Sequence, residues 1–403
     1  MREARFSDMG IRKARGRVGL GAGLVALAAS VLFAGAGPAA AATGYIDVAF
    51  SEAGALVVAV QQDGTTPWTI EQVAAAPNGT DWGSPSLYRQ TTGGLVLAAV
   101  RSDGSLWFFW QGPGATNWNP EEVAGPGTDD GVNQPAIASQ APLEPGDQTE
   151  TMIVVQTTSP FGGANYYTQV NGTPEWTSGK LPTATGIADQ PDVTVAPDDT
   201  FLVSFSATAP GNTIATDFQV DRLPYNSSTW SNVVVTTNTA QLQNTSIIEQ
   251  SAGGVIVAAS DFSGNTYFFW SPAGQPTVWH QESVETGLDL TSVASYIQPM
   301  ALTGADTGVA IGASNGTGEC DLAFEQADGA TGWNSQTVGC SNGPATEALG
   351  LQPNSDNEVA ATVDALGYAY FYWQQDGTGT WHTEKIPGSG SATPYTSASI
   401  AVT

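Results

Sequence analysis

The residues best suited to chemistry are polar and aromatic side chains in segments that join strand-like runs. Carboxylates and amides suit the hydroxyl groups of a sugar or a hard cation such as calcium, and an exposed aromatic ring can stack on a sugar. Ordinary solvated loops are the alternative interpretation. The candidate ligand-binding residues are Trp82, Arg101, Asp103, Asp129, Asp130, Gln134, Asp189 and Gln190.

Catalytic motifs have little support. His280 and His382 each follow a tryptophan at equivalent places in separate repeats, so they do not share a metal, and no further histidine is present for a Ser-His-Asp triad. The string GASNG at 312–316 joins two strand-like runs, whereas a nucleophile elbow leads into a helix. We therefore predict no catalytic residues. A glycoside hydrolase or lyase remains open, because two carboxylates suffice for that chemistry.

A sevenfold repeat organises the chain. Tryptophans recur at intervals of 48 to 58 residues, and Val, Leu or Ile stands five positions after each. A period near fifty that is built of strand-like segments is typical of a β-propeller. We predict an all-β fold of seven four-stranded antiparallel blades. The tryptophans are Trp68, Trp118, Trp176, Trp230, Trp279, Trp333 and Trp381.

Each unit contains short β segments between glycine-rich turns. The second unit shows them most clearly, as SLYRQ at 86–90, LVLAAV at 95–100, LWFFWQ at 106–111 and WNPEEV at 118–123. The aromatic third segments indicate core packing, because each blade is covered on both faces. Connections between units and turns after second segments share one face of a propeller, so we expect the candidate residues to gather there.

The first unit lacks a first strand, and the C-terminus has a spare one. Tyr45 lies 23 residues before Trp68, as Leu95 lies 23 before Trp118, so YIDVAF matches a second strand. The segment PYTSASIAVT at 394–403 resembles the first strands of other units. We predict that it pairs with the first unit and closes the ring, which removes open sheet edges.

Residues 1–42 have the pattern of a secretory signal peptide, with a basic stretch, an apolar run and an alanine cluster. The mature chain, 43–403, is then a single secreted propeller domain. Removing six of 11 Lys/Arg and two of 38 Asp/Glu leaves five cations against 36 anions, a net charge near −31. Such a surface repels nucleic acid and anionic membranes. The oligomeric state stays open.

Cys320 and Cys340 are the only cysteines, and they flank an expected turn near Gly329 and Ala330. Antiparallel strands that turn there bring the two residues opposite one another. In an oxidising compartment this arrangement predicts a disulfide, with free buried thiols as the alternative.

Unit two resembles the repeats of bacterial and fungal propeller lectins. The likeness is carried by AAVRSDGSLWFFWQ at 98–111 followed by Trp118, and it extends weakly over all seven units. It implies sugar binding near Arg101 and Asp103; a plain hairpin turn is the alternative. The segments QQDGTTPW at 61–68, QADGATGW at 326–333 and QQDGTGTW at 374–381 look like degenerate Asp boxes of sialidase-type propellers, which implies topology and not catalysis.

Together these observations predict a secreted, non-catalytic binding module with an extracellular glycan as its partner. A carbohydrate-active enzyme and a protein-interaction scaffold are the rival hypotheses. No cofactor is expected, although calcium remains possible.

Overall fold

A computed structural model describes the chain between residues 44 and 402. The described part excludes 53, 63–66, 78, 128–133, 142–148, 158–162, 171–172, 183–186, 209–214, 238–241, 250–253, 262–264, 285–297, 302–308, 315–319, 326–332, 339–345, 353–356, 376–379 and 391–393. Thr43–Thr403 forms one compact unit, and Met1–Ala42, the predicted signal peptide, lies outside the described residues. Among the described residues, no helix is long and apolar enough to cross a membrane.

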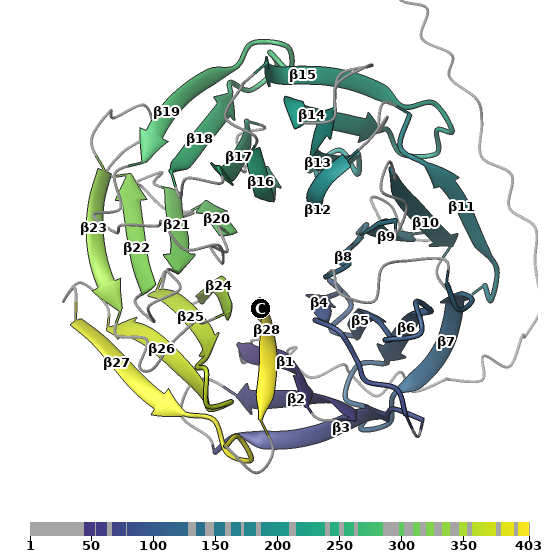
Figure 1. Cartoon of the computed structure of the whole chain (residues 1–403), viewed down its shortest axis with the longest axis vertical. Helices are drawn as coiled ribbons and strands as arrows, with labels where there is room; N and C mark the ends of the chain where they lie inside the picture. The colour runs from purple at the N-terminus through teal and green to yellow at the C-terminus, as the bar shows by residue number, and fades with distance from the viewer. Residues whose placement is uncertain are drawn as a thin grey trace, which may run out of the picture. The chain divides into compact units, whose positions relative to one another are not determined.

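The described strands form seven four-stranded antiparallel sheets, here called blades 1 to 7 in chain order (Figure 1). Blade 1 consists of β28 (Tyr395–Val402), β1 (Tyr45–Glu52), β2 (Ala55–Gln62) and β3 (Thr69–Ala75). Blade 2 is β4 (Ser86–Arg89), β5 (Leu95–Val100), β6 (Leu106–Gln111) and β7 (Asn119–Ala124); blade 3 is β8 (Ala136–Ser139), β9 (Glu150–Gln156), β10 (Ala164–Val170) and β11 (Trp176–Lys180).

The remaining four blades follow the same order from first to fourth strand. Blade 4 is β12 (Ile187–Val195), β13 (Phe201–Thr208), β14 (Ala215–Leu223) and β15 (Ser231–Thr237); blade 5 is β16 (Leu242–Glu249), β17 (Val255–Asp261), β18 (Thr266–Ser271) and β19 (His280–Val284). Blade 6 is β20 (Gln298–Ala301), β21 (Val309–Ser314), β22 (Cys320–Glu325) and β23 (Trp333–Val338); blade 7 is β24 (Thr346–Gln352), β25 (Asn357–Val363), β26 (Ala369–Gln375) and β27 (Thr380–Lys385).

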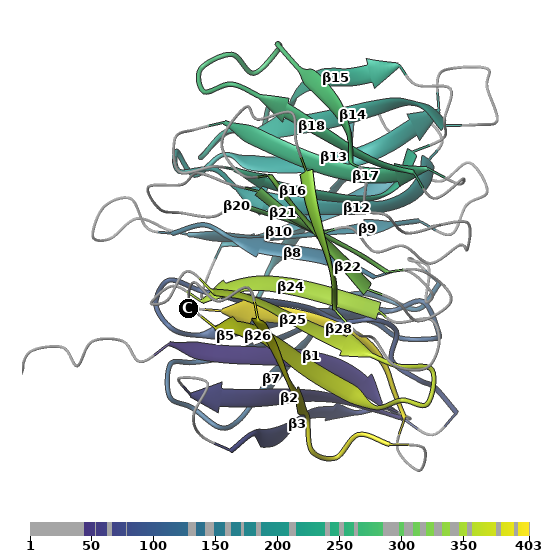
Figure 2. The same cartoon turned by 90° about the vertical axis from the view of Figure 1, so that its left-hand side faces the viewer.

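Burial falls from the inner to the outer strands of a blade. The first strands of successive blades contact one another around the centre (Figure 1). Every residue of β5 and β17 is buried, because neighbouring blades cover both faces of these second strands. The fourth strands β3 and β7 are largely exposed. Seen from the side, the strands run from one face of the ring to the other (Figure 2).

Aromatic pairs link neighbouring blades and explain the spacing of the repeat tryptophans. Trp68 packs edge-on against Phe371 of the preceding blade, with ring centroids 5.3 Å apart. Trp176 meets Phe108 in the same way at 5.1 Å, and Trp230 meets Tyr166 at 5.0 Å. In blades 1, 3 and 4 the repeat tryptophan therefore packs on the third strand of the blade before it. Aromatic pairs of this kind add to the free energy of simple burial.

The C-terminal strand β28 is hydrogen-bonded to β1 and completes blade 1. The register pairs Ile46 with Val402 and Phe50 with Ala398, and Phe50 stacks on Tyr395 with centroids 4.6 Å apart. On the other side, the Leu87 amide of β4 donates to Ser399 Oγ at 2.9 Å. The two ends of the described chain thus lie in one sheet.

We expect deletion of residues 394–403 to destabilise the whole domain. Tyr395 and Ile400 are buried, and losing the burial of these two side chains alone removes about 3–6 kcal/mol. The measurement is the melting temperature of the truncated chain by calorimetry. As a control, a peptide of residues 394–403 added in trans should restore part of the lost stability. An unchanged melting temperature would contradict the role of β28.

The cysteines are only partly placed. The register sets Cys320 of β22 opposite Val338 of β23, two residues before Cys340. The sequence predicted that the two cysteines stand directly opposite one another, and the register of these strands differs from that prediction. Cys340 itself lies outside the described residues, so the disulfide stays a prediction.

Non-reducing mass spectrometry tests that disulfide. We expect the protein purified from an oxidising compartment to resist alkylation at both cysteines until it is reduced. Reduction should lower the free energy of unfolding by about 3 kcal/mol, because it opens the loop that the bond closes. Alkylation of both thiols before reduction would show that the bond is absent.

Candidate functional site

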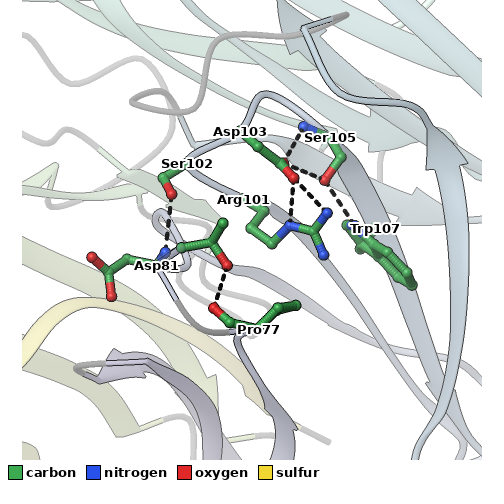
Figure 3. A network of polar contacts seen from close by, with 8 residues as sticks. Pro77, Asp81, Arg101, Ser102, Asp103, Ser105 and Trp107 are labelled. Atoms are coloured by element: carbon green, nitrogen blue, oxygen red, sulfur yellow. Dashed lines mark hydrogen bonds and ion pairs between the residues drawn. The ribbon is translucent and has the colours of Figure 1, made fainter.

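The turn between β5 and β6 holds two of the predicted ligand-binding residues (Figure 3). Arg101 donates to Asp103 Oδ2 from Nε at 3.0 Å and from Nη2 at 2.5 Å. The amide and hydroxyl of Ser105 donate to Asp103 Oδ1 at 3.0 and 2.6 Å, and Trp107 Nε1 donates to Ser105 Oγ at 2.9 Å. The carboxylate therefore organises its own turn.

The two charged side chains of this turn also pair with one another. The hydrogen bond from Arg101 lowers the pKa of Asp103 to about 2, with further lowering by the donors of Ser105. The Arg101 guanidinium lies over the Trp107 ring, 5.3 Å from its centroid. Asp103 thus already accepts four hydrogen bonds, about as many as a carboxylate can take. The geometry favours a structural hairpin turn over a sugar-binding pair.

Trp82 is buried, and the prediction of an exposed stacking platform there is wrong. The residue is 7% exposed, and its ring packs edge-on against Trp107 and Phe109 at centroid distances of 6.3 and 5.5 Å. The Gly83 amide donates a hydrogen bond to the Val100 carbonyl oxygen, and an isolated β-bridge pairs Trp82 with Arg101. These contacts hold the connection from blade 1 against the end of β5. The connection thereby covers the end of blade 2, and the Trp82 ring packs between the connection and the aromatic side chains of β6.

The other predicted residues do not assemble with this turn in the described structure. Gln134 donates from Nε2 to the backbone oxygen of Pro85 at 3.0 Å and so ties two connections together. Asp129 and Asp130 lie outside the described residues. Asp189 and Gln190 belong to β12, at an irregularity in its pairing with β13, instead of to a connecting loop. Of the eight predicted residues, the structure brings Trp82, Arg101 and Asp103 together. Their contacts stabilise blade 2 and its turn.

We expect Trp82→Ala to lower the free energy of unfolding by about 3–5 kcal/mol, because it opens a cavity in the core of blade 2. The matched control is Trp110→Ala, which removes the same side chain where it is 40% exposed and should cost about 1 kcal/mol or less. Chemical denaturation of both variants gives the comparison. Equal losses would mean that Trp82 is not a core residue.

A different cluster lies at the boundary between blades 2 and 3. Trp110 of β6 donates from Nε1 to Glu121 Oε1 of β7 at 3.1 Å. The other oxygen, Oε2, accepts from Gln169 at 2.8 Å and from Trp176 Nε1 at 3.4 Å, both in blade 3. One carboxylate therefore orients two indole rings, and the Trp110 ring is open to solvent.

Blade 5 repeats the tryptophan-glutamate hydrogen bond, and blade 7 places the same residue types at the equivalent register positions. Trp270 Nε1 donates to Glu282 at 3.4 Å, and its ring stacks on His280 with centroids 4.1 Å apart. In blade 7, Trp373 stacks on His382 at 5.3 Å, and Glu384 accepts from Gln61 of blade 1 at 3.3 Å. We name these three tryptophan-glutamate pairs the rim clusters: Trp110 and Glu121, Trp270 and Glu282, Trp373 and Glu384.

The rim glutamates have a sequence signal of their own, which is a fixed distance from the repeat tryptophans. Glutamate stands three residues after the repeat tryptophan in units one, two, five and seven, at Glu71, Glu121, Glu282 and Glu384. Core packing holds for Phe108 and Phe109 but not for Trp110. Trp110 is the penultimate residue of β6, whereas Phe108 and Phe109 lie in the middle of the strand.

The described acidic side chains bear on two further kinds of site, a metal centre and a catalytic acid. No group of three or more His, Cys, Asp or Glu side chains there is arranged to hold a metal ion, and calcium binding stays a prediction. Burial raises the pKa of Glu249 to about 7; the Asp198 carboxylate raises it further and Arg222 opposes it. A carboxyl group that stays protonated near neutral pH has the property of a general acid.

Comparisons with known proteins define the class by fold. No protein-family model matches the sequence, and no curated protein matches it. The BP39L lectin from Burkholderia pseudomallei is similar in structure, with a TM-score of 0.61 and 15% identity, covering 85% of this chain and 95% of that one. A protein of unknown function from Dyadobacter fermentans has a TM-score of 0.51 and 12% identity over 76% and 94% of the two chains.

The fold is that of a β-propeller with four-stranded antiparallel blades, and propeller lectins are among its structural neighbours. A lectin from Aleuria aurantia, described as a six-bladed β-propeller, has a TM-score of 0.49 and 10% identity over 78% of this chain and 97% of that one. These comparisons support neither the predicted number of seven blades nor the predicted Asp boxes. The count of seven sheets comes from the strand pairing of the described residues.

Proposed function

We propose that this protein is a secreted, non-catalytic module that binds extracellular glycans through its rim clusters. One observation carries the proposal: an open or half-buried tryptophan on the third strand and a glutamate on the fourth recur at equivalent positions of blades 2, 5 and 7, and the two are hydrogen-bonded in blades 2 and 5. The lectin neighbour supports it at the level of fold. The signal-like pattern of residues 1–42 supports secretion.

The chemistry of a rim cluster suits a sugar ring. An indole face offers a flat apolar surface for the C–H groups of a pyranose, and its edge keeps a fixed orientation because Nε1 is bonded to the glutamate. Backbone and amide groups nearby, such as Asn119, provide hydrogen-bonding partners for hydroxyls. A glutamate that fixes two rings, as Glu121 does, lowers the entropy lost on binding.

The number of clusters suits a repetitive ligand. Three equivalent clusters on separate blades let one polymer engage more than one site, and the second contact then benefits from a high effective concentration. Weak individual sites thereby give useful overall affinity. A long polysaccharide fits this arrangement better than a single small sugar.

We expect the purified protein to sediment with insoluble polysaccharide and to release no product. Trp110→Ala combined with Trp270→Ala should weaken binding about threefold to tenfold per site, since each stacking contact contributes about 0.5–1.5 kcal/mol. The control is Leu366→Ala, which truncates a 50% exposed residue on another turn and should leave binding unchanged. Equal binding by the tryptophan variant and the unaltered protein would contradict the rim location.

Glycoside hydrolysis is the second candidate, and the raised pKa of Glu249 is the observation that favours it. The same incubation separates the two functions. Release of soluble sugar that stops after Glu249→Gln would replace the binding assignment with an enzymatic one. Binding without release, unaffected by Glu249→Gln, supports the non-catalytic module.

A further inference from the structure

Cations on this protein are scarce, and three of the five Lys and Arg residues after residue 42 are engaged within the fold. Between residues 43 and 403 the sequence holds five Lys and Arg against 36 Asp and Glu. Arg89 pairs with the buried Asp47, Arg101 pairs with Asp103, and Lys385 Nζ lies 3.5 Å from the centroid of the Tyr368 ring. The surface therefore has little positive charge with which to bind an acidic ligand.

The rim carboxylates are not neutralised by Lys or Arg. Among the described residues, Glu121 accepts hydrogen bonds from two indoles and an amide, Glu282 from an indole and Glu384 from an amide. All of these donors are uncharged groups, and neither of the ion pairs formed by Arg89 and Arg101 includes a rim glutamate. Each cluster thus combines an aromatic face with a negative charge that no cation offsets.

This combination has a preferred kind of ligand. An ammonium group is attracted to the face of an indole, and its hydrogen bond to a carboxylate is about twice as strong as one between neutral groups. An acidic sugar meets repulsion from the same glutamate and from the acidic surface around it. A neutral sugar gains the stacking contact alone.

We propose that the ligand of the rim clusters is an amine-bearing polysaccharide, such as a polymer of glucosamine, in preference to neutral or acidic glycans. The inference rests on the proposed glycan-binding function and adds the charge of the ligand. The ammonium group sits beside Glu121, Glu282 or Glu384 while the sugar ring stacks on Trp110, Trp270 or Trp373. Blade 2 gives the simplest site, because Asn119 stands opposite Trp110 where the other two clusters have histidine.

Calorimetry with four oligosaccharides of equal length tests the proposal. The ligands are oligomers of glucosamine, N-acetylglucosamine, glucose and galacturonic acid, at a pH where the glucosamine amines are protonated. We expect the glucosamine oligomer to bind about tenfold more tightly than its acetylated counterpart, since a hydrogen bond to a charged group is stronger than one between neutral groups. The galacturonic acid oligomer should bind most weakly.

Two triple variants locate the effect. The test variant carries Glu121→Gln, Glu282→Gln and Glu384→Gln, and the control carries Asp81→Asn, Glu122→Gln and Glu175→Gln, which removes three charges from exposed positions elsewhere. Loss of the amine preference in the test variant alone supports the proposal. Equal loss in both variants overturns it, because a diffuse acidic surface then explains the attraction.

The remaining outcomes separate this inference from the proposed function. Equal affinity for the glucosamine, N-acetylglucosamine and glucose oligomers overturns the amine preference and leaves glycan binding intact. Absence of binding to all four overturns both. Where the test variant unfolds, the single variants Glu121→Gln, Glu282→Gln and Glu384→Gln decide: a reduced amine preference in any of them supports the rim clusters, and an unchanged preference in all three overturns them.

Discussion

The fold depends on the packing of one blade against the next. A second strand such as β5 is buried on both faces, which is possible only when a neighbouring blade covers each side. The repeat tryptophans make that contact specific, as Trp68 does on Phe371 and Trp176 on Phe108. Because every blade needs two neighbours, the ring has to close, and β28 closes it by completing the sheet of β1.

A glutamate at the outer edge reinforces some boundaries and not others. Glu71 accepts from Gln111 at 3.0 Å and Trp118 at 3.4 Å, as Glu121 does from Gln169 and Trp176. Blades 3 and 4 carry Gly179 and Val233 at the corresponding position, and Nε1 of Trp230 and of Trp279 is buried without a hydrogen-bond partner among the described residues. Nε1 of Trp68 is also unpaired there, although Glu384 of blade 7 stands at the corresponding position. An unsatisfied buried donor is unfavourable. The blades are thus equivalent in backbone pattern and unequal in polar contacts.

The same glutamates connect stability with the proposed binding. Glu121 joins two blades through Gln169 and Trp176, and it also fixes the exposed ring of Trp110. A ligand that stacks on Trp110 therefore meets a side chain already held by the fold. By contrast, Arg101 and Asp103 satisfy one another within a single turn, and little of their hydrogen-bonding capacity is left for a partner.

The sequence by itself determined the class of fold, because the spacing of the tryptophans records a contact made once per blade. It also located the strand that completes blade 1, since Tyr45 matches a second strand by its distance from Trp68 and the segment 394–403 resembles a first strand. Which aromatic and polar side chains face solvent was decided only by the tertiary structure. Trp82 is covered because the connection from blade 1 folds along β5. Trp110 is exposed although Phe108 and Phe109 of the same strand are buried. Exposure therefore depends on which segments pack over each ring, and those segments are distant in sequence.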